Sequence, residues 1–145
     1  MGGGIAMCCA NAGMKCYVLD VDQASLDRGM ELVRSNYERS RSLTPTQKAK
    51  ALANLCPTTS YADFADCDLV VEAVFEDMKV KKQIFKRLSK VCRRDAFLCS
   101  NTSALDIDEI ADVVEDPTRV MGTHFFSPAN VMKLLEIVRA DETSD

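Results

Sequence analysis

The sequence predicts an α/β protein with a doubly wound parallel sheet, and two observations predict it. Short apolar runs rich in Val, Leu and Ile alternate with longer segments whose apolar residues recur at helical spacing. The apolar runs do not alternate with polar residues, which is typical of strands covered by helices on both faces. Parallel sheets of this kind bind ligands beyond the carboxyl ends of their strands. The residues that follow each strand are therefore the candidates for a functional site.

Local signals define the expected elements of the first half of the chain. A helix over residues 2–12 ends at Gly13, and a strand covers 15–20. The next helix runs from 24 to about 41 and places a set of apolar residues on one face: Leu26, Met30, Val33 and Tyr37. Thr44 and Pro45 are typical of a helix cap and first turn, so we expect a helix to about residue 55. A short strand is expected at 57–61.

The second half continues the alternation of strands and helices. The run DLVVEAV at 68–74 predicts a buried strand, and 77–92 a charged amphipathic helix. Its apolar face is expected to hold Val80, Ile84, Leu88 and Val91. The remaining expected elements are strands at 96–100, 120–125 and 134–138 and a short helix at 107–114.

Length and composition restrict the class of protein. The chain has 145 residues, 47% of them hydrophobic and 28% charged, which predicts one globular domain over residues 1–145 and excludes disorder as the main state. A net charge of -4 argues against a nucleic-acid partner, which would need a basic face. No apolar run approaches the roughly 20 residues of a membrane span, and the glycine-rich start lacks a basic leader.

The seven cysteines predict buried, reduced thiols instead of a disulfide framework or a metal site. Their number is odd, they form no C-x-x-C pair, and most have small or apolar neighbours. His124 is the only histidine that could complete a zinc site. We therefore expect no metal.

One group of candidates follows the first strands and suits a dinucleotide. Met1 and Gly2 open a glycine-rich helix start, which can bring backbone N–H groups close to a pyrophosphate. Asp20 ends the next strand, where a carboxylate can bind the adenosine ribose and repel a 2'-phosphate, which favours NAD over NADP. The alternatives are a floppy chain end and a solvated strand-end or helix-capping Asp20.

The third cofactor feature lies at the end of the strand at 68–74. Val74 and Phe75 offer an apolar floor for a flat ring, with Glu76 and Lys81 at the start of the next helix. Lys81 belongs to a basic stretch, so a solvated helix face is the alternative interpretation.

A second group of candidates can carry proton chemistry. His124 closes the strand at 120–125, and histidine is the side chain best matched to proton transfer near neutral pH. Glu136 lies on the return strand after the turn at Pro128, and a carboxylate against one ring nitrogen fixes the tautomer of the other. Ser103 ends the run SNTS, whose hydroxyls can hold a substrate oxygen. Taken singly, the histidine could be structural and SNTS a helix-capping sequence.

Four motifs together resemble the NAD-binding domain of 3-hydroxyacyl-CoA dehydrogenases over essentially the whole chain. They are MGGGIA at 1–6, DLVVEAVFE at 68–76, SNTS at 100–103 and HFFSP at 124–128. The tail VMKLLEIV at 131–138 looks most like the multifunctional, peroxisomal-type β-oxidation enzymes. The resemblance implies a Rossmann-like fold and NAD-dependent oxidation of L-3-hydroxyacyl-CoA to 3-oxoacyl-CoA.

The resemblance also implies a role for each candidate residue. The catalytic set is His124 as the base, Glu136 as its support and Ser103 as a hydrogen-bond donor to the reacting oxygen. The cofactor-binding set is Met1, Gly2, Asp20, Val74, Phe75, Glu76, Lys81, Ser103 and Ser127. Ser127 stands where many family members carry Asn, and it keeps a hydrogen-bonding group with shorter reach.

Two segments of the family pattern are missing from this sequence. The family's first strand, with the opening glycines of its turn, should precede Met1, and a helical domain that closes over acyl-CoA and forms the dimer contact should follow Asp145. We therefore expect a sheet without its first strand, and a fragment with little or no turnover alone.

The sequence leaves some functional questions open. The alternatives are a short-chain 3-hydroxybutyryl-CoA dehydrogenase and a non-catalytic dinucleotide-binding relative. The expected partner is an acyl-CoA substrate, with no nucleic acid and no membrane span. The expected location is intracellular, with the peroxisome ahead of the mitochondrial matrix and the cytoplasm.

Overall fold

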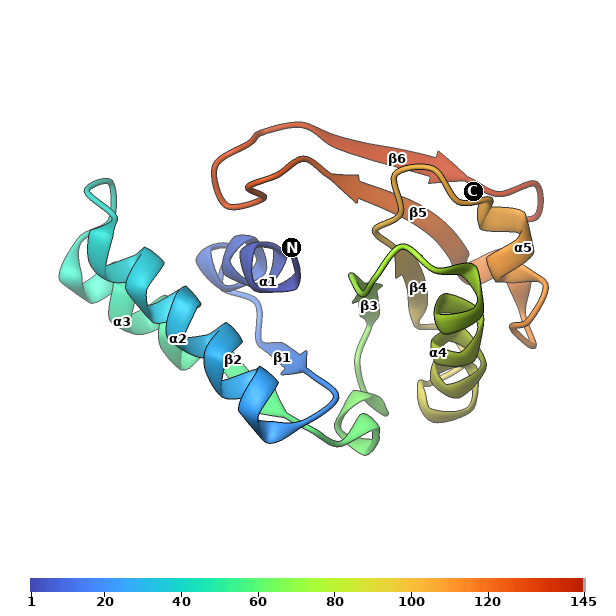
Figure 1. Cartoon of the computed structure of the whole chain (residues 1–145), viewed down its shortest axis with the longest axis horizontal. Helices are drawn as coiled ribbons and strands as arrows, with labels where there is room; N and C mark the ends of the chain where they lie inside the picture. The colour runs from blue at the N-terminus through green and yellow to red at the C-terminus, as the bar shows by residue number, and fades with distance from the viewer. Residues whose placement is uncertain (145) are drawn as a thin grey trace. The chain divides into compact units, whose positions relative to one another are not determined.

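The computed structural model describes residues 1–144, which form two compact units (Figure 1). The first unit comprises Met1–Asp63 together with Ser127–Met132. The second comprises Phe64–Phe126 and the residues from Lys133 onward. Each unit has its own strands and helices and is described by itself.

The first unit holds a two-stranded parallel sheet and three helices. Its elements are α1 (Gly2–Asn11), β1 (Cys16–Leu19), α2 (Gln23–Arg39), α3 (Pro45–Ala53) and β2 (Leu55–Thr58). Strands β1 and β2 are parallel, with Cys16 opposite Leu55 and Leu19 opposite Thr58. The order of elements agrees with the prediction.

Local chemistry sets the ends of these helices. Gly13 follows α1 with φ of 86°, a left-handed conformation that glycine adopts without steric cost. The Asp22 side chain accepts a hydrogen bond from the Ser25 N–H and caps α2. Thr44 and Gln47 form a capping box at the start of α3, as the Thr44-Pro45 pair predicts.

The core of the first unit lies along one face of α2. Its buried residues are Leu26, Met30, Val33 and Tyr37, which confirms the face predicted from their spacing. They pack with Ala6, Met7 and Ala10 of α1. A Cβ atom on Gly3 would lie 3.1 Å from Val33 Cγ2, so the glycine allows the two helices to approach closely.

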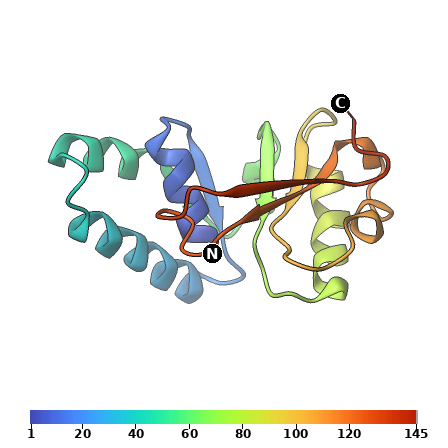
Figure 2. The same ribbon diagram turned by 90° about the horizontal axis from the view of Figure 1, so that it is seen from above.

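The second unit holds a four-stranded sheet in the order β3-β4-β5-β6. Its elements are β3 (Leu69–Glu72), α4 (Met78–Val91), β4 (Phe97–Ser100), α5 (Ile107–Ala111), β5 (Val120–Phe125) and β6 (Leu135–Arg139), with short 3-10 turns at Tyr61–Phe64 and Pro117–Arg119. The first three strands are parallel, and β6 returns antiparallel to β5. Figure 2 shows β5 and β6 running side by side.

The parallel pairing confirms the predicted fold class, but the strands form two sheets instead of one. Within residues 1–144, β1 pairs only with β2. Strand β3 lies at the edge of the other sheet and pairs only with β4.

Three predicted details of the elements are wrong. Helix α3 ends at Ala53, and β2 begins at Leu55 instead of 57. Pro57 can lie inside β2 because β2 is an edge strand. Helix α5 ends at Ala111, three residues before the predicted end at 114.

The buried face of α4 also differs from the predicted one. It consists of Lys81, Phe85, Leu88 and Ser89. Val80 is 38% exposed, and Ile84 and Val91 are half-buried. Lys81, which the helical spacing of apolar residues assigns to solvent, therefore lies in the interior.

Several compositional predictions can be compared with the described residues. All seven cysteines are free, with Cys92 and Cys99 buried and the other five half-buried. Burial raises the pKa of the Cys99 thiol to about 11 despite a hydrogen bond with Thr123 that lowers it. None of the helices in residues 1–144 is both long and apolar enough to cross a bilayer. The same residues bring together no three His, Cys, Asp or Glu side chains suited to a metal ion.

Candidate active site

The candidate residues are divided between the two units. Met1, Gly2, Asp20 and Ser127 belong to the first unit, and Val74, Phe75, Glu76, Lys81, Ser103, His124 and Glu136 to the second. The geometry is therefore given within each unit.

In the first unit, the start of α1 offers backbone donors. Met1 occupies the N-cap and its carbonyl accepts from the Gly4 N–H at 2.9 Å. The N–H groups of Gly2 and Gly3 precede this first hydrogen bond of the helix, and the helix dipole makes this end attractive to an anion. A Cβ atom on Gly4 would lie 3.3 Å from the Ala129 Cβ, so the segment that carries Ser127 passes close to this helix.

Asp20 follows directly after β1, as the sequence predicts. One of its carboxylate oxygens accepts a hydrogen bond from the Val21 N–H at 2.7 Å. The second oxygen is the one suited to an outside donor. Ser127 precedes Pro128 across a cis peptide bond and is exposed.

In the second unit, the antiparallel pairing of β5 and β6 brings His124 and Glu136 together. The two residues are opposite one another in the register. The Nδ1 atom of His124 lies 2.9 Å from Oε2 of Glu136, and the ring of Phe126 packs against the imidazole at 4.8 Å. The His124 side chain is 23% exposed and that of Glu136 is 52% exposed. A carboxylate only accepts hydrogen bonds, so this contact places the proton on Nδ1 and the lone pair on Nε2.

The end of β4 is joined to the histidine strand by a hydrogen bond. The Asn101 side-chain oxygen accepts from the Phe125 N–H, next to His124, at 2.8 Å. Asn101 also donates its own N–H to the Glu72 carbonyl at 2.8 Å. The loop that carries Ser103 is therefore fixed to both neighbouring strands.

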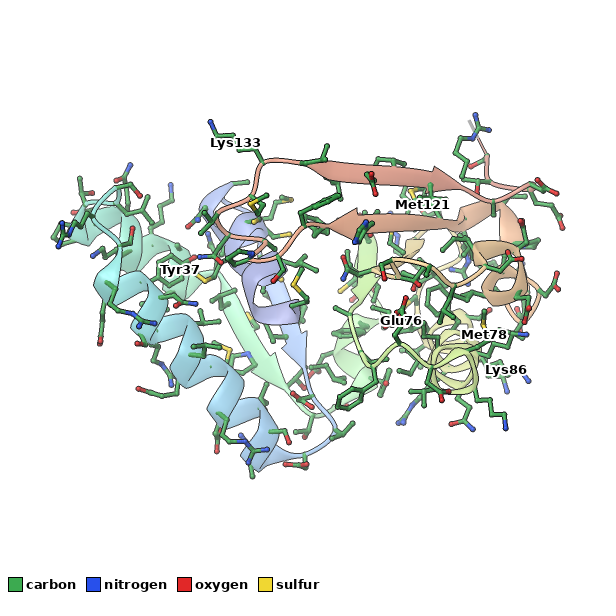
Figure 3. All side chains as sticks on the ribbon, turned by 45° about the horizontal axis from the view of Figure 1, so that its top comes forward. Tyr37, Glu76, Met78, Lys86, Met121 and Lys133 are labelled. Atoms are coloured by element: carbon green, nitrogen blue, oxygen red, sulfur yellow. The ribbon has the colours of Figure 1, made fainter. Side chains whose placement is uncertain are left out.

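Glu76 holds the same loop from the other side. Figure 3 labels Glu76 on the segment between β3 and α4. One of its oxygens accepts from the Thr102 hydroxyl and from the Ser103 N–H, the latter at 3.0 Å. Partial burial alone would raise the pKa of Glu76, but the bonds from Thr102 and Ser103 and the Lys81 charge outweigh it and hold this pKa below its usual range. Glu76 is therefore a carboxylate, and it orients the backbone of Ser103.

Lys81 lies in the interior, so the solvated helix face is the wrong interpretation for this residue. Its side chain is fully buried, and Nζ lies 2.8 Å from Glu72 Oε1 and 3.5 Å from Glu76 Oε2. The other cofactor candidates of this loop are open: Val74 is 40% exposed and Phe75 88%. These two side chains can contact a ligand directly, whereas Lys81 contacts other side chains.

Glu72 is a charged residue of this region that the sequence prediction missed. It ends β3, its side chain is 1% exposed, and it bonds both Lys81 and Ser100. An acidic residue in the interior of the run DLVVEAV, with a lysine nine residues later, is the signal that could have identified it.

The sequence was compared with families and proteins of known identity. The model of the family "3-hydroxyacyl-CoA dehydrogenase, NAD binding domain" matches residues 1–145. The peroxisomal bifunctional enzyme of Cavia porcellus is 46% identical over 146 residues, covering 99% of this chain and 20% of that protein. The fatty acid oxidation complex subunit alpha of a Psychrobacter strain is 38% identical over 149 residues, covering 100% of this chain and 21% of that protein. The chain thus spans about one fifth of the length of these relatives.

Solved structures give the same result. The 3-hydroxybutyryl-CoA dehydrogenase of Escherichia coli matches with a TM-score of 0.96 and 36% identity, covering 99% of this chain and 31% of that one. The dehydrogenase part of multifunctional enzyme 1 from C. elegans matches with a TM-score of 0.89 and 37% identity, covering 99% and 34%. The chain therefore belongs to the 3-hydroxyacyl-CoA dehydrogenase family and corresponds to its NAD-binding region.

Proposed function

We propose that this chain forms the NAD-binding domain of an enzyme that oxidises L-3-hydroxyacyl-CoA to 3-oxoacyl-CoA. The observation that carries the proposal is the contact of 2.9 Å between His124 Nδ1 and Glu136 Oε2. The contact occurs in a chain that belongs to a family of NAD-binding domains. A protein that only bound a dinucleotide would have no use for a histidine held in one tautomer by a carboxylate. This pair is the arrangement of a general base and its orienting group.

The chain's own groups account for the movement of the proton. His124 Nε2 takes the proton of the substrate's 3-hydroxyl, and Glu136 stabilises the imidazolium that results. Ser103 donates a hydrogen bond to the reacting oxygen from the loop that Glu76 and Asn101 fix. Bound NAD would supply the acceptor for the hydride of the substrate's C3. The oxidation of the alcohol is then balanced by one proton on His124 and one reduced nicotinamide.

The chain also has groups that suit the rest of the cofactor. Met1 and Gly2 supply backbone N–H groups for the pyrophosphate at the start of α1, where glycines leave no Cβ atoms in the way. Asp20 accepts hydrogen bonds from the ribose hydroxyls and repels a 2'-phosphate, which selects NAD over NADP. Val74 and Phe75 in the second unit and Ser127 in the first lie on exposed segments, where a ligand can reach their side chains.

The experiment that tests this function uses the whole protein that contains this chain. We expect NADH formation from 3-hydroxyacyl-CoA and NAD, and much slower turnover with NADP. Lys82→Gln, at a half-buried residue of α4 outside the candidate site, is a control variant that should keep wild-type rates. Absence of NADH formation with every acyl chain length would overturn the proposal.

The same assay separates this function from a short-chain alternative. The match to a 3-hydroxybutyryl-CoA dehydrogenase favours a C4 substrate, whereas the name of the peroxisomal bifunctional enzyme specifies no chain length. A ratio of kcat/KM values for C4 and C16 substrates distinguishes the two. The 145-residue chain alone is expected to show little or no turnover, because it spans only about one fifth of the length of the relatives it matches.

The names of the relatives also support a location. The peroxisomal relatives from guinea pig and rice favour a peroxisomal protein, and the bacterial relatives a cytoplasmic one. Imaging of the tagged whole protein against a peroxisomal marker tests this choice.

A further inference from the structure

Glu72 is a buried carboxylate to which the proposed reaction assigns no task. It accepts hydrogen bonds from three directions: from the Val74 N–H at 2.7 Å, from the Ser100 hydroxyl at 2.7 Å and from Lys81 Nζ at 2.8 and 2.9 Å. These donors belong to the loop after β3, to β4 and to α4. One side chain therefore joins three elements at the end of the sheet where the candidate residues lie.

The partner of Glu72 is equally unusual for its position. The Lys81 side chain is fully buried, whereas Lys86, one helical turn and a half later on α4, is exposed and points away from the sheet (Figure 3). Burial of an ammonium is costly unless it is paired and hydrogen-bonded. Glu72 provides that pairing with both of its oxygens.

The Lys81 ammonium also reaches the half-exposed carboxylate of Glu76. Its Nζ lies 3.5 Å from Glu76 Oε2, while Glu76 Oε1 accepts from the Ser103 N–H at 3.0 Å. The contacts thus run from Glu72 through Lys81 and Glu76 to Ser103. At its exposed end this series of contacts carries the loop assigned to the reacting oxygen and the cofactor.

We infer that Glu72 is a positioning residue for NAD binding, which holds the Lys81 ammonium so that it fixes Glu76 and, through Glu76, Ser103. The inference rests on the proposed function only for the identity of the ligand. It also explains why the interior keeps two opposite charges, since an apolar pair of similar size is often as stable as a buried ion pair.

Three variants of the whole protein test the inference, with NADH affinity measured by fluorescence titration. In Glu72→Gln, the Lys81 ammonium loses its main partner and draws Glu76 away from Ser103. In Lys81→Met, Glu76 loses the positive charge beside it. The double variant Glu72→Gln/Lys81→Met removes both charges. We expect about a tenfold rise in the NADH Kd in all three, the effect of one charge-assisted hydrogen bond. The KM for NAD should rise in parallel. Because His124 and Glu136 are untouched, kcat should fall only as far as the displaced Ser103 weakens its hydrogen bond to the reacting oxygen.

Thermal unfolding separates positioning from a purely structural role. Each single variant leaves one buried charge unpaired and should unfold at a lower temperature, whereas the charge-balanced double variant should regain most of the loss. The inference predicts that the double variant regains stability without regaining NADH affinity.

Two control variants on the same helix complete the experiment. Phe85→Leu alters a fully buried side chain of α4 and leaves the carboxylates in place, so it should lower stability and keep the NADH Kd. Lys82→Gln removes the exposed ion pair with Glu109, at 2.7 Å, and should change neither.

Two results would overturn the inference: wild-type NADH affinity in the double variant, or an equal loss of affinity in Phe85→Leu. Failure of the proposed function is a separate result, because it requires that the wild-type protein oxidise no 3-hydroxyacyl-CoA. The Kd measurements remain decisive for Glu72 in that case.

Discussion

The second unit contains two pairs of a carboxylate and a basic side chain that differ in their access to solvent. His124 and Glu136 face each other across β5 and β6 with 23% and 52% of their side chains exposed. Lys81 and Glu72 have 0% and 1% exposed. The distances between the paired atoms, 2.9 and 2.8 Å, are nearly the same.

This difference in exposure suits the two pairs to different roles, one in proton transfer and one in stabilising the fold. A base must reach its substrate and change protonation state, so it needs an open side and a partner that tolerates both states. A buried ammonium between two carboxylates needs its partners in place, because the loss of either side of the buried pair would leave a charge unpaired in the interior. We therefore expect the open pair to determine the rate of reaction and the buried pair to determine stability and geometry.

The largest effect is expected from breaking the buried pair. Lys81→Met leaves the Glu72 carboxylate unpaired, and loss of one partner of a buried pair costs about 3–5 kcal/mol of unfolding free energy. Urea unfolding of the whole protein measures the change. Lys82→Gln, one residue away in an exposed pair, should stay within about 1 kcal/mol of wild type. Equal stability of the two variants would contradict the comparison.

At the open pair of His124 and Glu136, the main expected effect is on the rate of reaction instead of on stability. His124→Gln removes the proposed base and should lower kcat by roughly 10²-fold or more, the range of a general acid–base group. The NADH Kd should stay within a few-fold of wild type, because the imidazole does not hold the cofactor in this proposal. Steady-state kinetics and fluorescence titration provide the two measurements. Equal turnover of variant and wild type would remove His124 from the mechanism.

Much of the fold follows from sequence patterns because the patterns are local. The buried face of α2 has four apolar residues at helical spacing, from Leu26 to Tyr37, and it is predicted correctly. The contact between His124 and Glu136 follows from two strands and a turn, since β6 returns beside β5. The roles assigned to the site residues stay predictions.

The buried pair could not be predicted in the same way, because it depends on how the sheet meets α4. Val80 and Lys81 are neighbours, and a rotation of 100° along the helix decides which of them faces inward. Hydrophobicity alone favours Val80 for the inward position, but the Glu72 carboxylate on β3 makes that position suitable for the Lys81 ammonium. The spacing of apolar residues along α4 contains no information about the charge of Glu72 on the preceding strand.

A smaller effect on the rate is expected at the partner of the histidine. Glu136→Gln keeps a hydrogen-bond acceptor near Nδ1 but removes the charge that stabilises the imidazolium. We expect kcat to fall about tenfold, a part of the contribution of the acid–base pair. Stability should hardly change because Glu136 is 52% exposed. A loss as large as that of His124→Gln would show that the two residues act as an indivisible unit.

The smallest effect is expected at Glu76, which touches both solvent and the buried pair. Its pKa is held below its usual range in the folded chain: partial burial raises it, and bonds from Thr102, Ser103 and Lys81 outweigh that effect. A carboxyl whose folded pKa is depressed contributes stability above its unfolded pKa and loses it as the pH falls through the folded value. Wild type should therefore be more stable than Glu76→Gln at pH 7, and the two should converge as the pH falls below about 4.5, the ordinary value for this group. Because the side chain is 40% exposed, solvent screens these charges and the difference should be modest. Unfolding curves for both proteins between pH 3 and pH 7 measure it, and a gap that stays constant over this range would mean that the charge of Glu76 contributes nothing to the stability of the loop.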